Sequence, residues 1–200
     1  MRDSLVKFFN EVFYNEYPYD WTLQVLRPEK KKGHTSQNPK LRGVAISSLL
    51  PTLYDIILDK RFNKWYKINA EQAGFREHQG CTVQLFAIYL LMELLKSRDE
   101  ELFVGFIDYE KAFDFTNRAE IVKDLMLKKV GSVFTRAIAR MYRNTYYIPK
   151  VSKQRTGEPI RARHGVTQGQ KTAANLFSFA ISDIPKAIQL NDSLDGNSCS

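Results

Sequence analysis

Residues 102–114 read LFVGFIDYEKAFD, an apolar run that delivers Asp108 and then breaks at once into polar sequence. The run from 102 to 107 is short and apolar throughout, which favours a strand covered on both faces, although periodicity alone does not exclude a buried helix. A core strand cannot easily bury an ionised carboxylate, so we expect Asp108 at the exposed end of the strand with a cation or a donor nearby. Magnesium suits such a position, because it binds through few carboxylates together with substrate phosphates. The alternative is that Asp108 caps a turn and Asp114 lies on a solvated loop.

The composition limits the class of protein. With 200 residues, of which 44% are hydrophobic and 12% aromatic, the chain can bury a sizeable core as one domain or as two small interleaved ones, and intrinsic disorder is disfavoured. Thirty Lys and Arg residues against 22 Asp and Glu residues give a net charge of +8, which suits a polyanionic partner or a well-solvated surface. Cys81 and Cys199 are too few for a disulfide framework or a zinc cluster, which fits a reducing compartment.

The N-terminal residues do not read as a signal peptide. Residues 1–11 carry charges and lack a small-residue cleavage site. The longest apolar stretch, residues 85–95, is broken by Glu93 and is too short to cross a bilayer. We therefore expect a soluble, intracellular protein with no membrane partner.

The spacing of apolar and turn-forming residues predicts both helices and strands. Strands are expected at residues 22–26, 44–46, 146–151 and 160–163. Helices are expected within 1–20, over 49–65, 83–96 and 118–130, from 132 onward, and after the loop 165–169. The helix over 83–96 is strongly apolar, so we expect it to be largely buried, with Thr82 as its cap. Asn117 is expected to cap the helix over 118–130 and Gly131 to end it.

In kind and in order, these pieces resemble the fingers and palm of a reverse transcriptase, closest to the enzymes of LINE-type (non-LTR) retrotransposons. The resemblance covers roughly residues 21–190. It implies an α+β fold that forms a partial right-hand polymerase without a thumb. The implied parts are an N-terminal helix and aromatic loop at 1–20, fingers at 21–100, an incomplete palm at 101–190 with interleaved fingers helices at about 119–160, and a disordered tail at 191–200.

Residues 106–114, FIDYEKAFD, resemble the first palm motif of that family. The resemblance implies that Asp108 is a ligand of two catalytic Mg²⁺ ions and that Tyr109 lends a backbone carbonyl. It also implies that the ring of Phe113 lies beneath the incoming sugar and excludes a ribose 2′-hydroxyl; the alternative is an ordinary packed core ring. Asp114 matches a family position as a local structural or helix-starting carboxylate.

Residues 165–169, GVTQG, followed by Asn175-Leu176-Phe177, resemble the next palm motif. Glycines there let the backbone come close to a nucleotide, and the resemblance implies that Gln168 and Gly169 line the nucleotide and template pocket. The sequence departs from the family at 170–174, where QKTAA stands in place of Asp-Pro-Leu-Ser-Pro or a similar run.

Basic residues match two fingers motifs. Residues 30–33, KKKG, with 41–46, LRGVAI, imply that Arg42 grips the triphosphate of the incoming nucleotide with Lys31 or Lys32, and that Lys30 contacts nucleic acid. Residues 72–76, QAGFR, imply that Arg76 contacts the template backbone. The helix expected from 132 onward carries a stripe of arginines, namely Arg136, Arg140 and Arg143. This stripe is either a solvated face or a nucleic-acid contact.

The family's palm also carries an aromatic residue, any residue and two adjacent aspartates, and this sequence has no Asp-Asp pair. We therefore expect a reverse-transcriptase domain truncated before that motif. Its relatives perform RNA-templated DNA synthesis by two-metal nucleotidyl transfer, with RNA template, DNA primer and dNTP as partners, and this chain is expected to be inactive alone. One alternative is a non-catalytic nucleic-acid-binding module that uses the basic fingers, the arginine stripe and three tyrosines, Tyr142, Tyr146 and Tyr147. Another is a chain without a selected role, which poor solubility would support.

Overall fold

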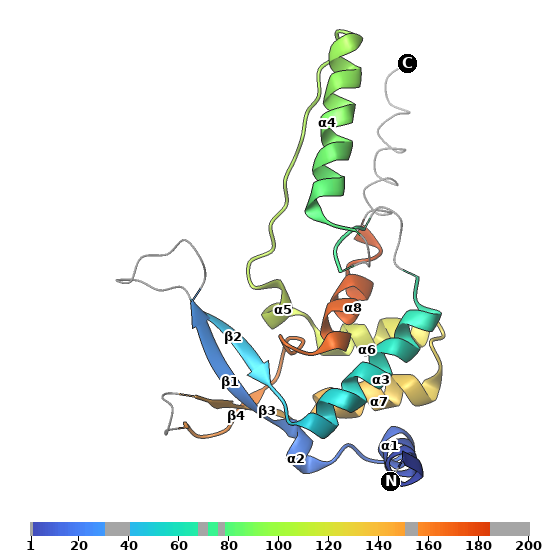
Figure 1. Ribbon diagram of the computed structural model, residues 1–200, viewed down its shortest axis with the longest axis vertical. Helices are drawn as coiled ribbons and strands as arrows, with labels where there is room; N and C mark the ends of the chain where they lie inside the picture. The colour runs from blue at the N-terminus through green and yellow to red at the C-terminus, as the bar shows by residue number, and fades with distance from the viewer. Residues whose placement is uncertain (1, 31–40, 68–71, 76–78, 151–155, 185–200) are drawn as a thin grey trace.

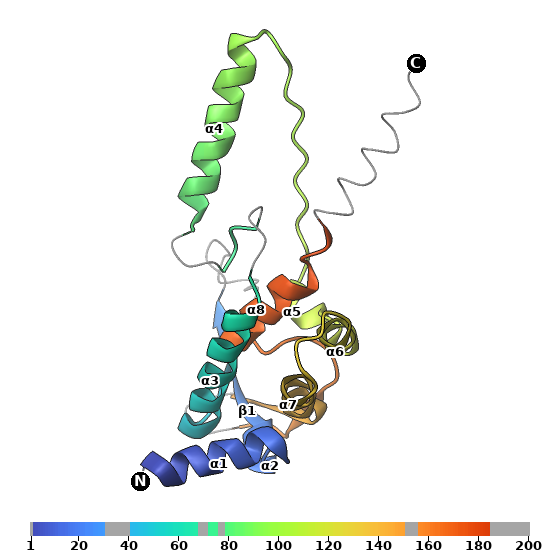
Figure 2. The same cartoon turned by 90° about the vertical axis from the view of Figure 1, so that its right-hand side faces the viewer.

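The computed structural model describes residues 2–30, 41–67, 72–75, 79–150 and 156–184. A small sheet and a group of helices lie together, and residues 81–109 project from them as a long arm (Figure 1). The same arm stands clear of the helices when the molecule is turned by 90° (Figure 2). The fold is therefore mixed, with helices and strands largely segregated, which is compatible with the expected α+β class.

The sheet has four strands in the order β2-β1-β3-β4. Strand β1 (Leu23–Lys30) pairs antiparallel with β2 (Leu41–Ile46) and parallel with β3 (Thr145–Pro149), which pairs antiparallel with β4 (Ile160–Ala162). The strands predicted at 22–26, 44–46, 146–151 and 160–163 therefore correspond to β1 to β4, and both sequence-adjacent pairs form hairpins. Strand β1 pairs with β2 over residues 25–30, so it continues past residue 26, where the strand was expected to end.

Four helices enclose the hydrophobic core: α3 (Leu49–Trp65), α6 (Arg118–Leu127), α7 (Ser132–Arg143) and α8 (Lys171–Ala180). Helix α3 packs on α8, and α6 packs on both α7 and α8. Their fully buried side chains interlock, and the largest are Tyr54, Leu58, Phe62, Ile121, Leu125, Ile138, Leu176 and Phe179. The helix predicted over 49–65 is confirmed at both ends.

The N-terminal segment folds onto this core as α1 (Arg2–Tyr14) and the short α2 (Tyr19–Thr22). Helix α1 packs against α7. Trp21 is buried edge-on against Phe8 at 5.7 Å and against Tyr17 at 5.5 Å between ring centroids. The predicted N-terminal helix and aromatic loop are thus part of the core.

The predicted N-cap of α6 is confirmed, whereas its predicted end is wrong by three residues. The side chain of Asn117 accepts hydrogen bonds from the backbone amides of Ala119, at 2.9 Å, and of Glu120, at 3.4 Å. The helix ends at Leu127, because Lys129 turns into the left-handed region with a φ of 55°. Gly131 consequently serves as the N-cap of α7, which begins at Ser132 as expected.

Helix α4 (Cys81–Ser97) forms where a helix over 83–96 was expected and extends beyond both predicted ends, but it is not buried. None of its residues is buried, its apolar side chains face all directions, and no other described element packs along it. Its N-cap is Gly80 instead of Thr82, and no side chain caps it. The prediction of burial was wrong. A helix that is apolar on all sides would be stabilised by burial, but its sequence does not determine whether other elements of the fold cover it.

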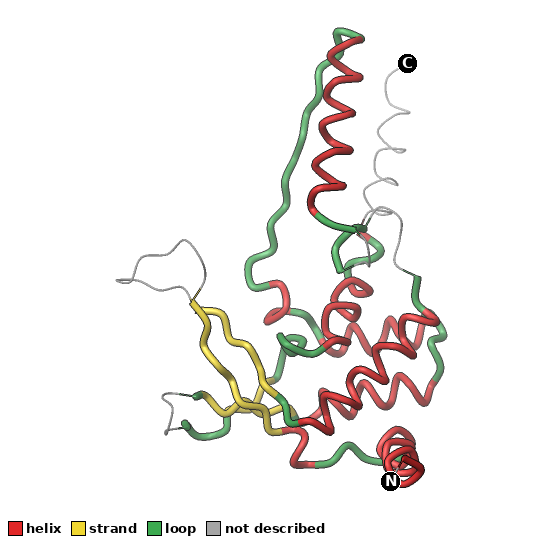
Figure 3. Tube along the Cα trace, viewed as in Figure 1, coloured by secondary structure: helices red, strands yellow, loops and turns green. Residues whose placement is uncertain are grey.

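The strand expected at residues 102–107 is absent from the described part of the chain. Residues 101–109 run as an extended segment that pairs with no described strand (Figure 3). Phe103 and Phe106 are 87% and 86% exposed. An apolar run becomes a strand only when a neighbouring strand satisfies its backbone, and all four strands of the sheet come from other segments.

None of the helices in the described ranges combines the length and the hydropathy that a bilayer crossing requires.

Candidate functional site

Three segments that lie far apart in the sequence meet at one place. They are α5 (Ala112–Phe115) with the residues just after it, the loop at 165–170, and β2. The amide of Val166 donates to the carbonyl of Phe113 at 2.8 Å, and the amide of Ala45 donates to the carbonyl of Gln168 at 2.9 Å. Backbone hydrogen bonds therefore join the two segments that resemble palm motifs to the strand that resembles a fingers motif.

Two glycines make this meeting possible. Gly165 has a φ of +80°, and a Cβ there would lie 2.6 Å from the carbonyl oxygen of Asp114. Gly169 has a φ of +114°, and a Cβ there would lie 2.6 Å from the carbonyl oxygen of Ala45. Both positions require glycine because the loop approaches other backbone segments too closely for any side chain. The expected close approach of a nucleotide to Gly169 stays a prediction.

Phe113 is half-buried beside this junction. Its ring stacks on Phe177 of α8, with centroids 5.1 Å apart and planes inclined by 23°. The ring of Phe75 meets it edge-on at 5.8 Å. The packing contacts that the sequence allowed as an alternative are thus present, and a role of the ring in sugar selection stays a prediction.

Gln168 and Asp114 contact each other through their side chains. The amide nitrogen Nε2 of Gln168 donates to Oδ1 of Asp114 at 3.1 Å, and Asp114 lies in the first turn of α5. The pair therefore links the end of the first palm-like motif to the second. It also fixes the amide of Gln168 beside Phe113, on the loop that follows Gly165.

Asp108 and Tyr109 are exposed at the end of the extended segment, just before the turn that leads into α5. The carboxylate of Asp108 makes no hydrogen bond or ion pair with another described residue. No group of three or more His, Cys, Asp or Glu side chains within the described ranges could hold a metal ion. The assignment of Asp108 and Tyr109 to a magnesium site therefore stays a prediction.

Of the basic residues predicted from the fingers motifs, Arg42 and Lys30 lie on the paired strands β2 and β1. Arg42 is exposed on β2, opposite Glu29 in the register with β1. Lys30 is the last residue of β1. Lys31, Lys32 and Arg76 lie outside the described residues.

Asp55 fixes the start of α8 and was not singled out from the sequence. Its buried carboxylate on α3 accepts hydrogen bonds from the backbone amide of Lys171 at 2.6 Å, from the amide of Thr172 at 3.4 Å, and from the hydroxyl of Thr172. Burial raises the pKa of this carboxyl, and the hydrogen bonds from Thr172 and Lys171 oppose that change. The carboxylate caps α8 from a neighbouring helix, so it also fixes where the loop at 165–170 ends.

Arg118 ties the same loop to α7 and β4. Its Nε donates to the carbonyl of Gly165 at 2.6 Å, and its Nη1 donates to the carbonyls of Tyr142 at 2.9 Å and Ala162 at 2.7 Å. Its guanidinium also lies over the ring of Tyr142, 5.1 Å from the centroid. Burial lowers the pKa of Arg118. Its place directly after the cap Asn117 gave no sign of these distant contacts.

No protein-family model matches the chain. The chain is 23% identical over 150 residues to the Retrovirus-related Pol polyprotein from type-1 retrotransposable element R2 of Nasonia vitripennis. The similarity supports a retrotransposon-related origin. The match covers 75% of this chain and 14% of that polyprotein, so the chain spans about one seventh of the curated relative's length.

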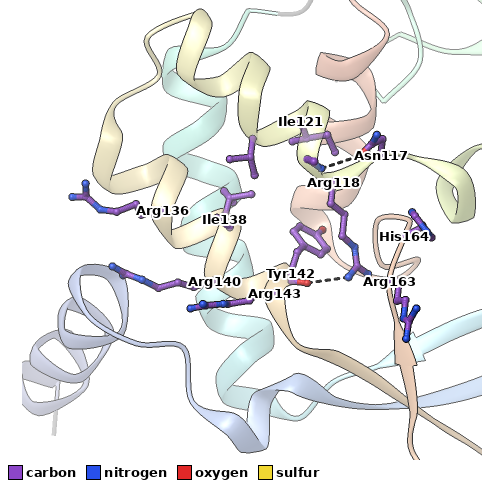
Figure 4. A pocket seen from close by; sticks show the side chains of 13 residues that line it. Asn117, Arg118, Ile121, Arg136, Ile138, Arg140, Tyr142, Arg143, Arg163 and His164 are labelled. Atoms are coloured by element: carbon purple, nitrogen blue, oxygen red, sulfur yellow. Dashed lines mark hydrogen bonds between the residues drawn. The ribbon is translucent and has the colours of Figure 1, made fainter.

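The arginine stripe of α7 lines a cavity of about 660 Å³ between α6, α7 and the end of β4 (Figure 4). Arg136 and Arg143 are exposed, whereas Arg140 is half-buried and donates from Nη1 to the carbonyl of Phe13 at 3.4 Å. Arg118 and Arg163 line the same cavity. The structure therefore gathers the three predicted arginines with two that the sequence did not indicate.

Proposed function

We propose that this chain is a reverse-transcriptase-related region of a retrotransposon polymerase that handles an incoming nucleotide beside an RNA–DNA primer–template. The observation that carries the proposal is the junction of α5, the loop at 165–170 and β2. These segments match family motifs in their order along the chain, and their backbones are hydrogen-bonded to one another. The similarity to the R2 Pol polyprotein supports the same reading and makes nucleic acid the expected partner.

The chemistry of the junction suits one nucleotide. Phe113 offers a flat apolar ring against which a sugar can pack, and the stack on Phe177 holds that ring in place. Gln168 offers an amide that is already oriented by Asp114. We assign residues 21–100, with the β1–β2 hairpin, α3 and α4, to the fingers. We assign residues 101–190 to the palm, with interleaved fingers helices at about 119–160.

We also propose Asp108 as one magnesium ligand, with the backbone carbonyl of Tyr109 beside it. A two-ion centre needs further carboxylates to fix the spacing of the ions, and the sequence has no adjacent aspartate pair. This chain by itself is therefore expected to bind a primer–template without extending the primer.

A binding experiment tests the nucleotide site. A fluorescently labelled, recessed RNA–DNA primer–template is titrated with the protein in Mg²⁺ buffer, with the next complementary dNTP, a non-complementary dNTP or the complementary rNTP. We expect the complementary dNTP to tighten the complex most. Phe113→Val is expected to reduce the preference for dNTP over rNTP, because the smaller side chain leaves room for the 2′-hydroxyl.

Phe115→Val is the matched control, since Phe115 lies on the same short helix but is 71% exposed. Equal affinity with complementary and non-complementary dNTP would overturn the proposed site, as would equal effects of the two phenylalanine variants. Thermal unfolding of both variants checks that the fold survives. Primer extension by the unmodified chain that disappears in Asp108→Ala would contradict the expected inactivity.

A further inference from the structure

The cavity beside α7 is rich in positive charge and poor in negative charge. Five of its lining residues are arginines: Arg118, Arg136, Arg140, Arg143 and Arg163. His164 also lines the cavity, and no described residue that lines it is Asp or Glu. In Figure 4 the arginines form a row across the view, from Arg136 on α7 to Arg163 after β4. Such a row is suited to more than one phosphate along an extended strand.

These guanidinium groups are not neutralised within the described part of the chain. None of the five arginines forms an ion pair with a described carboxylate. Arg118 is the extreme case, because its Nη2 is buried without a hydrogen-bond partner among the described residues. A desolvated cation that lacks a counter-charge is unfavourable, so an anion in the cavity would relieve a cost that the fold already carries.

The floor of the cavity is apolar. It is lined by the accessible side chains Ala119, Val122 and Ala139 and by the buried Ile121 and Ile138, all on α6 and α7. A volume of about 660 Å³ is much larger than a phosphate ion and lies in the range of sites that hold a nucleotide-sized ligand. A phosphate alone would leave the apolar floor in contact with water.

We propose that this cavity binds a single-stranded nucleic acid, with backbone phosphates on the arginine row and an unstacked base on the apolar floor. A duplex fits less well, because its bases are stacked inside and cannot reach the floor. This strand site uses none of the residues of the proposed nucleotide site. The primer–template titration measures nucleotide selection, whereas titration with single-stranded RNA measures strand binding. Either proposal can therefore fail without the other.

The test compares two charge-matched double variants by fluorescence anisotropy with a labelled single-stranded RNA oligonucleotide over a series of salt concentrations. Arg136→Gln with Arg143→Gln removes two exposed cations of the row. Lys60→Gln with Lys64→Gln removes two exposed cations of α3, which lie outside the cavity. We expect the arginine variant to weaken binding by about ten-fold or more and to lower the salt dependence by about one to two counterions, with a much smaller effect in the lysine variant.

Ala139→Leu tests the floor without changing charge. It is expected to weaken single-strand binding while leaving the salt dependence unchanged, because it fills the space for the base. A mononucleotide is expected to displace the RNA at a lower concentration than inorganic phosphate does. Equal losses in the two double variants would overturn the proposal. So would equal binding of a blunt RNA duplex, wild-type affinity in Ala139→Leu, or displacement by phosphate and mononucleotide at the same concentration. Thermal unfolding checks the fold of each variant.

Discussion

Gly169 shows how one residue fixes the junction that carries the proposed function. Its φ of +114° lies in the region that L-residues rarely adopt, and an added Cβ would lie 2.6 Å from the carbonyl oxygen of Ala45. Because the obstacle is backbone, it cannot move aside as a flexible side chain would. The position therefore couples the loop at 165–170 to β2.

Gly169→Ala is expected to destabilise the protein by about 2 kcal/mol or more, through strain and displacement of the loop. Gly105→Ala is the control, because a Cβ there meets nothing within 4 Å and the φ of Gly105 is not positive. That change is expected to alter the free energy of unfolding by about 1 kcal/mol or less. Urea unfolding of the two variants measures both values, and equal values would contradict the close approach of Gly169 to Ala45.

Burial of Tyr54 is expected to make the folded protein less stable at alkaline pH. Burial raises the pKa of this side chain to about 12 from its usual value of 10. The folded state therefore retains a proton that the unfolded state loses, so the stabilisation is complete below pH 10 and falls as the pH rises toward 12. Burial raises the pKa of Tyr17 and Tyr142 as well, so all three act in the same direction.

The free energy of unfolding is accordingly expected to fall by roughly 2–3 kcal/mol for Tyr54 alone between pH 10 and pH 12. Urea unfolding at several pH values measures this slope. Tyr54→Phe has no ionisable group and is expected to show a shallower slope. An identical pH dependence in both proteins would exclude Tyr54 as a cause.

Asp55 and Arg118 mark what the sequence does not reveal about single residues. Asp55 is one polar residue on an amphipathic helix, and its partners Lys171 and Thr172 lie more than one hundred residues further along the chain. Arg118 reaches three carbonyls that only the folded chain gathers. Roles that depend on long-range backbone contacts leave no local pattern, whereas the cap Asn117 acts within its own helix and was predicted.

At the level of whole elements, the sequence predicts where helices and strands lie better than what covers them. Helix α3 was predicted with both ends correct, because its apolar stripe and its ends are local properties. Helix α4 was predicted with nearly the right length but the wrong burial. An apolar run indicates that burial would be favourable. Which elements pack against it depends on the fold of the whole chain. The extended segment before Asp108 fails as a strand for the same reason.

Two leucines on different helices test this difference in burial. Leu58 on α3 is 0% exposed, and Leu90 on α4 is 50% exposed. Leu58→Ala is expected to cost about 3–5 kcal/mol, because it leaves a cavity in the core. Leu90→Ala is expected to cost about 0.5 kcal/mol or less. Urea unfolding compares the two, and a large loss in Leu90→Ala would mean that α4 has a partner in solution.

Across the whole molecule, the chain brings together some of the positions that the sequence motifs indicated and leaves others apart. Phe113, Gln168 and the strand after Arg42 meet at one junction, whereas Asp108 stands on the arm. The resemblance implied that Phe113 and Gln168 serve one nucleotide pocket, and that role stays a prediction. The resemblance did not indicate the arginine cavity, since Arg118 and Arg163 are separated from the α7 stripe along the chain and meet it only in the fold.

The unpaired course of residues 102–109 has a consequence for hydrogen exchange. No backbone amide of this segment donates to another described residue, whereas α8 carries the fully buried Leu176 and Phe179. Protection of an amide follows the free energy of the local opening that exposes it. Deuterium is therefore expected to enter 102–109 at the earliest labelling time and α8 last, as measured by mass spectrometry of peptides. Slow uptake in residues 102–109 would mean that another segment forms hydrogen bonds with them. Rapid uptake would mean that the backbone leading to Asp108 is the least protected in the described part of the chain.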